Sequence, residues 1–170
     1  MKKILGWIKM SLKQLIEELK KQSSVSETLK AKLSYTGSFE LNVKTGRHKF
    51  IMDEDKVIGG TGKGPAPAQL LLVSIGGCLL STLHAWSEIL DIKVTSADVT
   101  VKGAINVMAM LGIDENAPHE FQNLTVDLTI ESDEPEDRIQ QLIDNVEKSC
   151  PVYSTIVNPC EVTTNIKMKS

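Results

Sequence analysis

The chain has 170 residues, of which 41% are hydrophobic and 24% are charged, and its net charge is −3. This length suffices for one domain with a hydrophobic core, and the composition is that of an ordinary globular protein. Aromatic residues make up only 4%, which leaves few side chains to stack on bases, and the negative net charge gives no overall basic surface. Neither feature indicates nucleic-acid binding. We expect no transmembrane helix and see no secretory signal, so a cytoplasmic protein with reduced cysteines is predicted.

The first segment of the chain predicts an amphipathic helix over residues 4–21. Its apolar residues repeat at spacings of three and four: Leu5, Ile8, Leu12, Leu15 and Leu19. We therefore divide the chain into an N-terminal helix with its linker, residues 1–27, and a domain, residues 28–170. The apolar stripe is expected to pack on the domain or on a dimer mate. Because residues 1–21 carry a net charge of +4, contact with an anionic membrane is the alternative that we favour less.

The domain begins with a pattern typical of antiparallel strands and then of a buried helix. Alternating apolar residues, with turns at Thr36-Gly37 and Thr45-Gly46, predict three short strands within residues 29–55. After a loop rich in glycine and proline, residues 68–90 form a long apolar run, which Pro65 or Pro67 can open. A helix that is apolar on all sides is expected to lie buried at the centre of a fold.

The second half of the chain predicts strands and helices in alternation. Two alternating segments, within residues 91–108 and 119–132, are expected to be strands. A helix then follows, with Asp133 as its expected N-cap, and the segment PCEVTTNIKMK is expected to be a closing strand. This order is typical of an α+β fold with mostly antiparallel pairing.

Two of the three cysteines stand in distinctive settings. Cys150 precedes Pro151, which suits the first position of a helix, so the thiol is expected at an N-cap, where the helix dipole favours thiolate. Cys78 follows Gly76 and Gly77 inside the long apolar helix, and we expect this glycine pair to allow the close approach of another segment or a substrate. On local sequence alone, both cysteines can equally be buried thiols without chemistry.

Two motifs together resemble a known family. The segment GPAPAQLLLVSIGGC ends at Cys78, and CPVYST begins 72 residues later at Cys150. In this order they resemble the OsmC/Ohr family of osmotically inducible and organic hydroperoxide resistance proteins, over roughly residues 29–169. The resemblance implies an OsmC-like fold, with an antiparallel sheet, a long buried central helix and an intertwined homodimer with sites at the subunit interface. It also implies thiol-dependent reduction of organic hydroperoxides, with Cys78 as the attacking thiolate, Cys150 as the resolving thiol and an external dithiol as reductant.

The chain departs from the hydroperoxide-resistance branch where that branch activates its first cysteine. A glutamate follows the helix-opening proline there, whereas Ala68 and Gln69 follow Pro67 here. Neither Arg47 nor Arg138, the only arginines, is matched to the arginine of that branch. Two other functions therefore remain open. One is a non-catalytic OsmC-fold protein that binds a small apolar ligand between the long helices, and the other is an adaptor that contacts a membrane or partner through the first helix.

The remaining polar residues predict no cofactor and no metal. His84 and Glu88 form an ordinary neighbouring pair on a helix, and no zinc-binding spacing occurs. The segment GGTGKG lacks the order of a phosphate-binding loop and is interpreted as a flexible loop near the rim of the site. Cys160 is taken as a structural or spare thiol, although it can compete with Cys150 as the resolving thiol. Three hydroxyl residues can share the helical face of Cys78: Ser74, Ser81 and Thr82.

Overall fold

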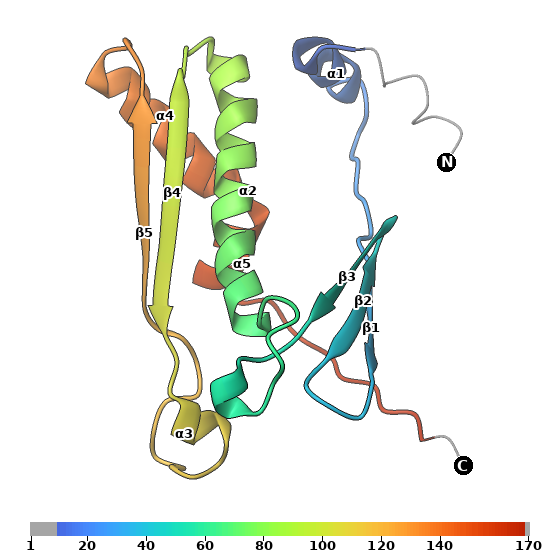
Figure 1. Ribbon diagram of the computed structural model, residues 1–170. Helices are drawn as coiled ribbons and strands as arrows, with labels where there is room; N and C mark the ends of the chain where they lie inside the picture. Colours follow the sequence, from blue (N-terminus) through green and yellow to red (C-terminus); the bar gives the residue numbers. More distant parts are fainter. Residues whose placement is uncertain (1–9, 169–170) are drawn as a thin grey trace. The chain divides into compact units, whose positions relative to one another are not determined.

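The structure is a computed structural model that describes residues 10–168, and the chain forms two compact units (Figure 1). The first unit holds the described residues up to Ser74 together with Thr100–Asp127, and the second holds Ile75–Val99 and the described residues from Leu128 onward. The elements are α1 (Leu12–Leu19), β1 (Ala31–Tyr35), β2 (Leu41–Thr45), β3 (His48–Met52), the 3-10 helix η2 (Lys56–Ile58), α2 (Pro67–Leu90), β4 (Ser96–Ala104), α3 (Val107–Met110), β5 (Gln122–Glu131), α4 (Glu136–Ser149) and α5 (Pro151–Val157). The predicted α+β class is confirmed.

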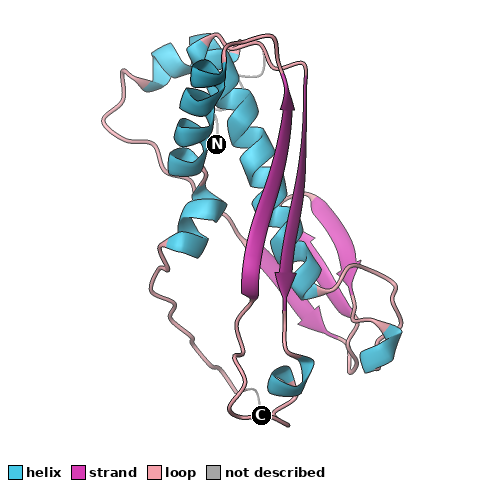
Figure 2. Ribbon diagram, turned by 90° about the vertical axis from the view of Figure 1, so that its left-hand side faces the viewer, coloured by secondary structure: helices cyan, strands magenta, loops and turns pink. Residues whose placement is uncertain are grey.

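Two antiparallel sheets account for all the strands in the described residues. β1, β2 and β3 pair in that order, with the predicted turns closed by Gly37 and Gly46, both of which have positive φ. Val43 and Met52 are buried and belong to the core of the first unit. β4 and β5 run in opposite directions as a long two-stranded ladder, which Figure 2 shows in magenta.

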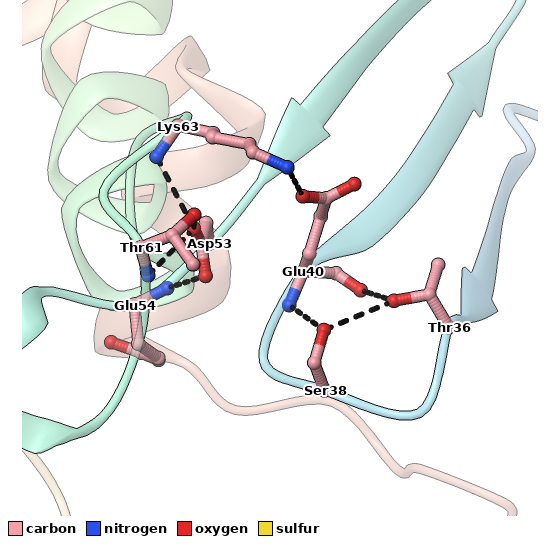
Figure 3. A network of polar contacts seen from close by, with 7 residues as sticks. All are labelled: Thr36, Ser38, Glu40, Asp53, Glu54, Thr61 and Lys63. Atoms are coloured by element: carbon pink, nitrogen blue, oxygen red, sulfur yellow. Dashed lines mark hydrogen bonds and ion pairs between the residues drawn. The ribbon is translucent and has the colours of Figure 1, made fainter.

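The glycine-rich loop between β3 and α2 is held in place, so the expectation of a flexible loop is wrong. Asp53 is only 1% exposed, and its carboxylate accepts hydrogen bonds from the N–H groups of Glu54, Thr61 and Lys63 and from the Thr61 hydroxyl (Figure 3). The Thr61 hydroxyl contributes most to lowering the pKa of Asp53, and the backbone donors add to it against the effect of burial. The Lys63 amine pairs with Glu40 next to β2.

Two glycines of this loop leave no room for a side chain. A Cβ on Gly60 would lie 1.9 Å from the backbone oxygen of Glu54, and one on Gly64 would lie 2.0 Å from the backbone oxygen of Ile51. Both contacts are with main-chain atoms, which cannot move aside as the end of a side chain can. The loop therefore depends on glycine at these positions.

Helix α2 begins at Pro67, as predicted, but it is buried on one side only within the described chain. The buried residues recur at helical spacing: Ile75, Gly76, Leu79, Leu83 and Ser87. On other sides of the helix Val73 and Ile89 are exposed. A single chain therefore does not enclose this helix on all sides.

One stretch of the chain has the length and apolar composition of a transmembrane helix, contrary to the ground on which none was expected. By length and apolar composition, α2 can cross a membrane, because it carries no charged residue before Glu88. The core helix of a globular protein meets the same two criteria. The residues that α2 buries, among them Ile75, Leu79 and Leu83, favour that second interpretation.

Two expected helix starts and one expected strand are wrong. Helix α1 begins after Ser11, which has extended backbone and caps the helix through a reciprocal pair of hydrogen bonds with Gln14, so the expected helix is not continuous from residue 4. Residues 4–9 lie outside the described residues. Helix α4 has Pro135 rather than Asp133 as its N-cap, since its first turn begins at Glu136. Residues 159–168 form no strand; they are exposed, and no described strand pairs with them.

Candidate active site

Cys150 lies at the junction of two helices in the second unit. It ends α4 and is the N-cap of α5, with Pro151 at the first helical position, as the sequence predicts. Its side chain is completely buried, together with Leu142 and Val146 of α4. The junction therefore presents the thiol to the interior of the unit.

The structure brings Cys150 and Cys78 together. The Cys150 thiol lies near enough to Cys78, in the middle of α2, to interact with it, and so does the hydroxyl of Thr82, one turn further along α2. All three cysteines are free thiols, and Cys78 is half-buried where Cys150 is fully buried. One thiol of the pair is thus accessible from outside, and the other lies behind it.

The environment of Cys150 keeps it protonated, contrary to the expected effect of the helix N-terminus. Burial raises the pKa of Cys150, and the neighbouring Cys78 sulfur raises it further, because two negative charges side by side repel one another. The N–H of Tyr153 and the Thr82 hydroxyl act in the opposite direction but do not reverse the shift. The Tyr153 N–H at the start of α5 is the strongest of the effects that lower this pKa, but burial of the thiol outweighs it.

Of the three hydroxyl residues near Cys78 in the sequence, only Thr82 takes part in the site. Ser74 and Ser81 donate hydrogen bonds to carbonyl oxygens one turn earlier in α2, at 2.7 and 2.8 Å. Spacing of three or four residues places all three near Cys78 along the helix. It does not distinguish the one whose hydroxyl turns toward the second cysteine, so the sequence alone could not single out Thr82.

Only one of the two glycines before Cys78 is buried. Gly76 is buried, whereas a Cβ on Gly77 would meet no atom within 4 Å. Within this chain, Gly77 therefore does not serve the close approach that the sequence suggested.

Gln69 and Arg138 form hydrogen bonds at the two ends of α2, away from the thiols. The Gln69 side chain accepts a hydrogen bond from the Ala66 N–H, 3.0 Å away, and so caps the start of α2. Arg138 donates to the carbonyl oxygens of Leu90 and Asp91 at the other end of α2, both at 3.1 Å. Leu90 lies twelve residues beyond Cys78, or about 18 Å along the helix. Arg138 therefore caps a helix and does not pair with the thiol.

The other polar candidates lie outside this cluster. His84 and Glu88 are exposed on α2, and Cys160 is exposed beyond α5. Among residues 10–168, no group of three or more metal-ligating side chains occurs. The chemistry of the site therefore rests on the two thiols and the hydroxyl beside them.

Residues 60–165, which contain both cysteines, match the family described as OsmC-like protein. The chain belongs to this family. Its fold is similar to that of an OsmC-like protein from Mycoplasma pneumoniae, with a TM-score of 0.68 and 18% identity over 79% of this chain and 91% of the other. No curated protein matches the chain.

Two further structures are named as organic hydroperoxide resistance proteins. A putative one from Vibrio cholerae, with captopril bound in one of its active sites, has a TM-score of 0.57 and 20% identity, over 81% of this chain and 89% of that protein. One from Elizabethkingia anophelis has a TM-score of 0.57 and 24% identity, over 81% and 92%. At these identities the likeness shows a shared OsmC-like fold.

Proposed function

We propose that this OsmC-like protein is a thiol-dependent peroxidase that reduces organic hydroperoxides with Cys78 and Cys150. The observation that carries the proposal is the contact between a half-buried thiol and a completely buried one. A hydroperoxide reaches the outer thiol first, and the inner thiol is ready to trap the oxidised product. Relatives named as organic hydroperoxide resistance proteins support the choice of substrate.

The first step takes place at Cys78. Its thiolate attacks the terminal oxygen of ROOH, so a sulfur–oxygen bond forms and the oxygen–oxygen bond breaks. The departing alkoxide takes up a proton and leaves as the alcohol ROH. Cys78 is then a sulfenic acid, oxidised by two electrons. The raised pKa of Cys150 keeps that residue a thiol during this step.

The second step joins the two cysteines. Cys150 loses its proton and attacks the Cys78 sulfur, the sulfur–oxygen bond breaks, and water leaves with that proton. The Thr82 hydroxyl donates to the Cys150 sulfur and so stabilises the thiolate at this moment. An external dithiol then reduces the disulfide by exchange, and both cysteines return to their starting state.

We propose further that the protein acts as a homodimer in the cytoplasm. The apolar residues that α2 leaves exposed need cover, as does the C-terminal segment, residues 159–168. In that segment apolar side chains alternate with polar ones, and Val162, Ile166 and Met168 are each more than 80% exposed. Such a pattern is typical of a strand with one covered face, and a second copy can supply its partner.

The experiment that tests the enzyme is consumption of an organic hydroperoxide with a dithiol reductant. The wild type is expected to turn over repeatedly, and Cys78→Ser is expected to consume no more than a protein-free sample. Cys160→Ser is the matched control, since it removes a thiol outside the pair, and it should keep full activity. Binding of hydroperoxide without its reduction by the wild type would favour the non-catalytic, ligand-binding alternative instead.

A further inference from the structure

Positive charge is concentrated at the start of the chain. Residues 1–52 contain eleven of the nineteen Lys and Arg residues but only four of the twenty-two acidic residues. This segment therefore carries a net charge of +7, while the remainder of the chain carries −10. The segment comprises α1 and the three-stranded sheet, which both belong to the first unit. An uneven distribution of this size indicates a partner of negative charge.

A row of lysines crosses the three-stranded sheet. The register pairs Lys32 of β1 with Lys44 of β2, and Lys44 with Lys49 of β3, so the three side chains share one face. All three are exposed, and among residues 10–168 none of them forms an ion pair, in contrast to Lys63, which pairs with Glu40. Like charges directly opposite one another destabilise a sheet. Stability of the fold therefore does not account for the row.

No acidic side chain of the strands shares that face. The next row of the same face consists of Ser34, Asn42 and Ile51. The opposite face carries Leu33, Val43 and Phe50, of which Val43 is buried. The sheet thus has one apolar face, of which Val43 is buried while Leu33 and Phe50 are exposed, and a cationic surface on the other face.

Helix α1 has an apolar face that is only partly covered, because the side chains that form it are half-buried. Leu12, Leu15, Ile16 and Leu19 follow one another at spacings of three, one and three, which places them on a single stripe. No residue of α1 is buried. On its polar side, Glu17 pairs with Lys20 and Glu18 with Lys21. The helix is therefore amphipathic, and its apolar face contains no fully buried residue.

We propose that α1 and the three-stranded sheet, within residues 10–52, dock on an anionic lipid bilayer. The apolar stripe of α1 would enter the boundary between headgroups and acyl chains, and the lysine row would lie against anionic headgroups. A short apolar contact or a basic patch alone gives marginal binding, and the two together give stable attachment. The acidic remainder of the chain would be repelled from the same headgroups.

Binding to vesicles by co-sedimentation tests the proposal with the full-length protein. The wild type is expected to bind vesicles of phosphatidylcholine with a quarter phosphatidylserine, and to bind pure phosphatidylcholine far more weakly. The triple variant Lys32→Gln, Lys44→Gln, Lys49→Gln is expected to lose on the order of a hundredfold in affinity, at roughly fivefold per lysine near an anionic surface. Leu15→Gln is expected to weaken binding to every vesicle, because it interrupts the apolar stripe.

Matched control variants show whether vesicle binding depends on this surface or on charged and apolar residues anywhere in the chain. Lys56→Gln, Lys93→Gln, Lys148→Gln removes three exposed lysines from the remainder of the chain, and Val57→Gln removes an apolar side chain that is 91% exposed. Both controls are expected to bind like the wild type. Equal losses in both triple variants would reduce the effect to net charge and overturn the proposal. So would the absence of any vesicle binding, together with protection of α1 amides from hydrogen exchange in the free protein, which would assign the stripe to a second copy.

Discussion

Cys150 is completely buried against Cys78, whose own side chain is half-buried on α2. This difference in access separates the roles of two otherwise identical side chains. An oxidant that enters from solvent meets Cys78, and a thiol without exposure cannot compete for it. The raised pKa of Cys150 also favours Cys78 as the first residue to react, because a protonated thiol is a poor nucleophile. In the proposed mechanism Cys150 loses its proton only when it attacks the Cys78 sulfenic acid.

Cys150→Ser should convert repeated turnover into a single turnover. Cys78 still attacks one hydroperoxide molecule, but no thiol is left beside it to form the disulfide. The sulfenic acid then reacts with a second oxidant molecule to give sulfinic acid. Stoichiometric consumption of hydroperoxide, followed by mass spectrometry of the peptide that contains Cys78, measures both effects.

The wild type under the same mild oxidation should yield a Cys78–Cys150 disulfide in unreduced peptides. Cys160→Ser should yield the same product, since Cys160 lies on the exposed segment beyond α5. A disulfide from Cys78 to Cys160 as the main product would instead make Cys160 the resolving thiol.

Thr82→Val should slow formation of the disulfide and move its pH dependence toward higher pH. The Thr82 hydroxyl lowers the pKa of Cys150, so its loss leaves that pKa higher and the thiolate scarcer at a given pH. A hydrogen bond to a charged group contributes about 1.5–3 kcal/mol, so disulfide formation near neutral pH should slow by roughly ten- to a hundredfold. Stopped-flow measurement of disulfide formation over a range of pH records the shift.

Thr82→Ser keeps the hydroxyl and should restore most of the rate. Ser81→Ala is the matched control, because its hydroxyl donates to the carbonyl oxygen of Gly77 rather than to a cysteine. A uniform slowing in Thr82→Val without any displacement along the pH axis would make the effect one of packing and not of hydrogen bonding.

Truncation after Asn158 should weaken the proposed homodimer. It removes the exposed alternating segment, which lacks a strand partner among the described residues. The full-length protein is expected to sediment as a dimer at micromolar concentration, and the truncated chain is expected to dissociate at concentrations where the full-length protein does not. Sedimentation of the full-length protein as a monomer would contradict the dimer itself, whatever the truncated chain does.

The sequence predicted those parts of the fold and site that depend on local patterns. The strand turns at Gly37 and Gly46, the start of α2 at Pro67 and the place of Cys150 between two helices all follow from short-range preferences. The prediction of a closing strand was wrong because an alternating pattern indicates only that one face of the segment is apolar. It does not state whether a strand of the same chain provides the pairing.

Asp53 shows why another part of the structure could not be predicted. In the sequence it is one of three acids in the segment MDED, and nothing marks it as the buried one. Its burial arises only when the loop folds back and brings Thr61 and Lys63 to its carboxylate. Such a contact spans eight to ten residues of irregular chain, where neither helical nor strand periodicity constrains the backbone.

Asp53→Asn should destabilise the protein at neutral pH and make its stability less sensitive to acid. The folded state lowers the pKa of Asp53 below its ordinary value of 3.8, chiefly through the Thr61 hydroxyl. A carboxyl with a lowered pKa stabilises the folded state fully above that ordinary value, and the contribution disappears as the pH falls through the lower folded pKa. The melting temperatures of wild type and variant should therefore differ most near pH 7 and converge below about pH 4.

Asp98→Asn serves as the matched control, because Asp98 is exposed on β4 and its substitution should leave the melting temperature unchanged at every pH.

Gly64→Ala tests the same loop independently of charge. Its added Cβ would meet the backbone oxygen of Ile51, so a loss of about 1–3 kcal/mol in the free energy of unfolding is expected, equal at pH 4 and pH 7. If the melting temperatures of Asp53→Asn and wild type kept a constant separation from pH 7 to pH 3, the carboxylate would stabilise the loop only by its shape. The network drawn in Figure 3 would then not depend on ionisation of Asp53.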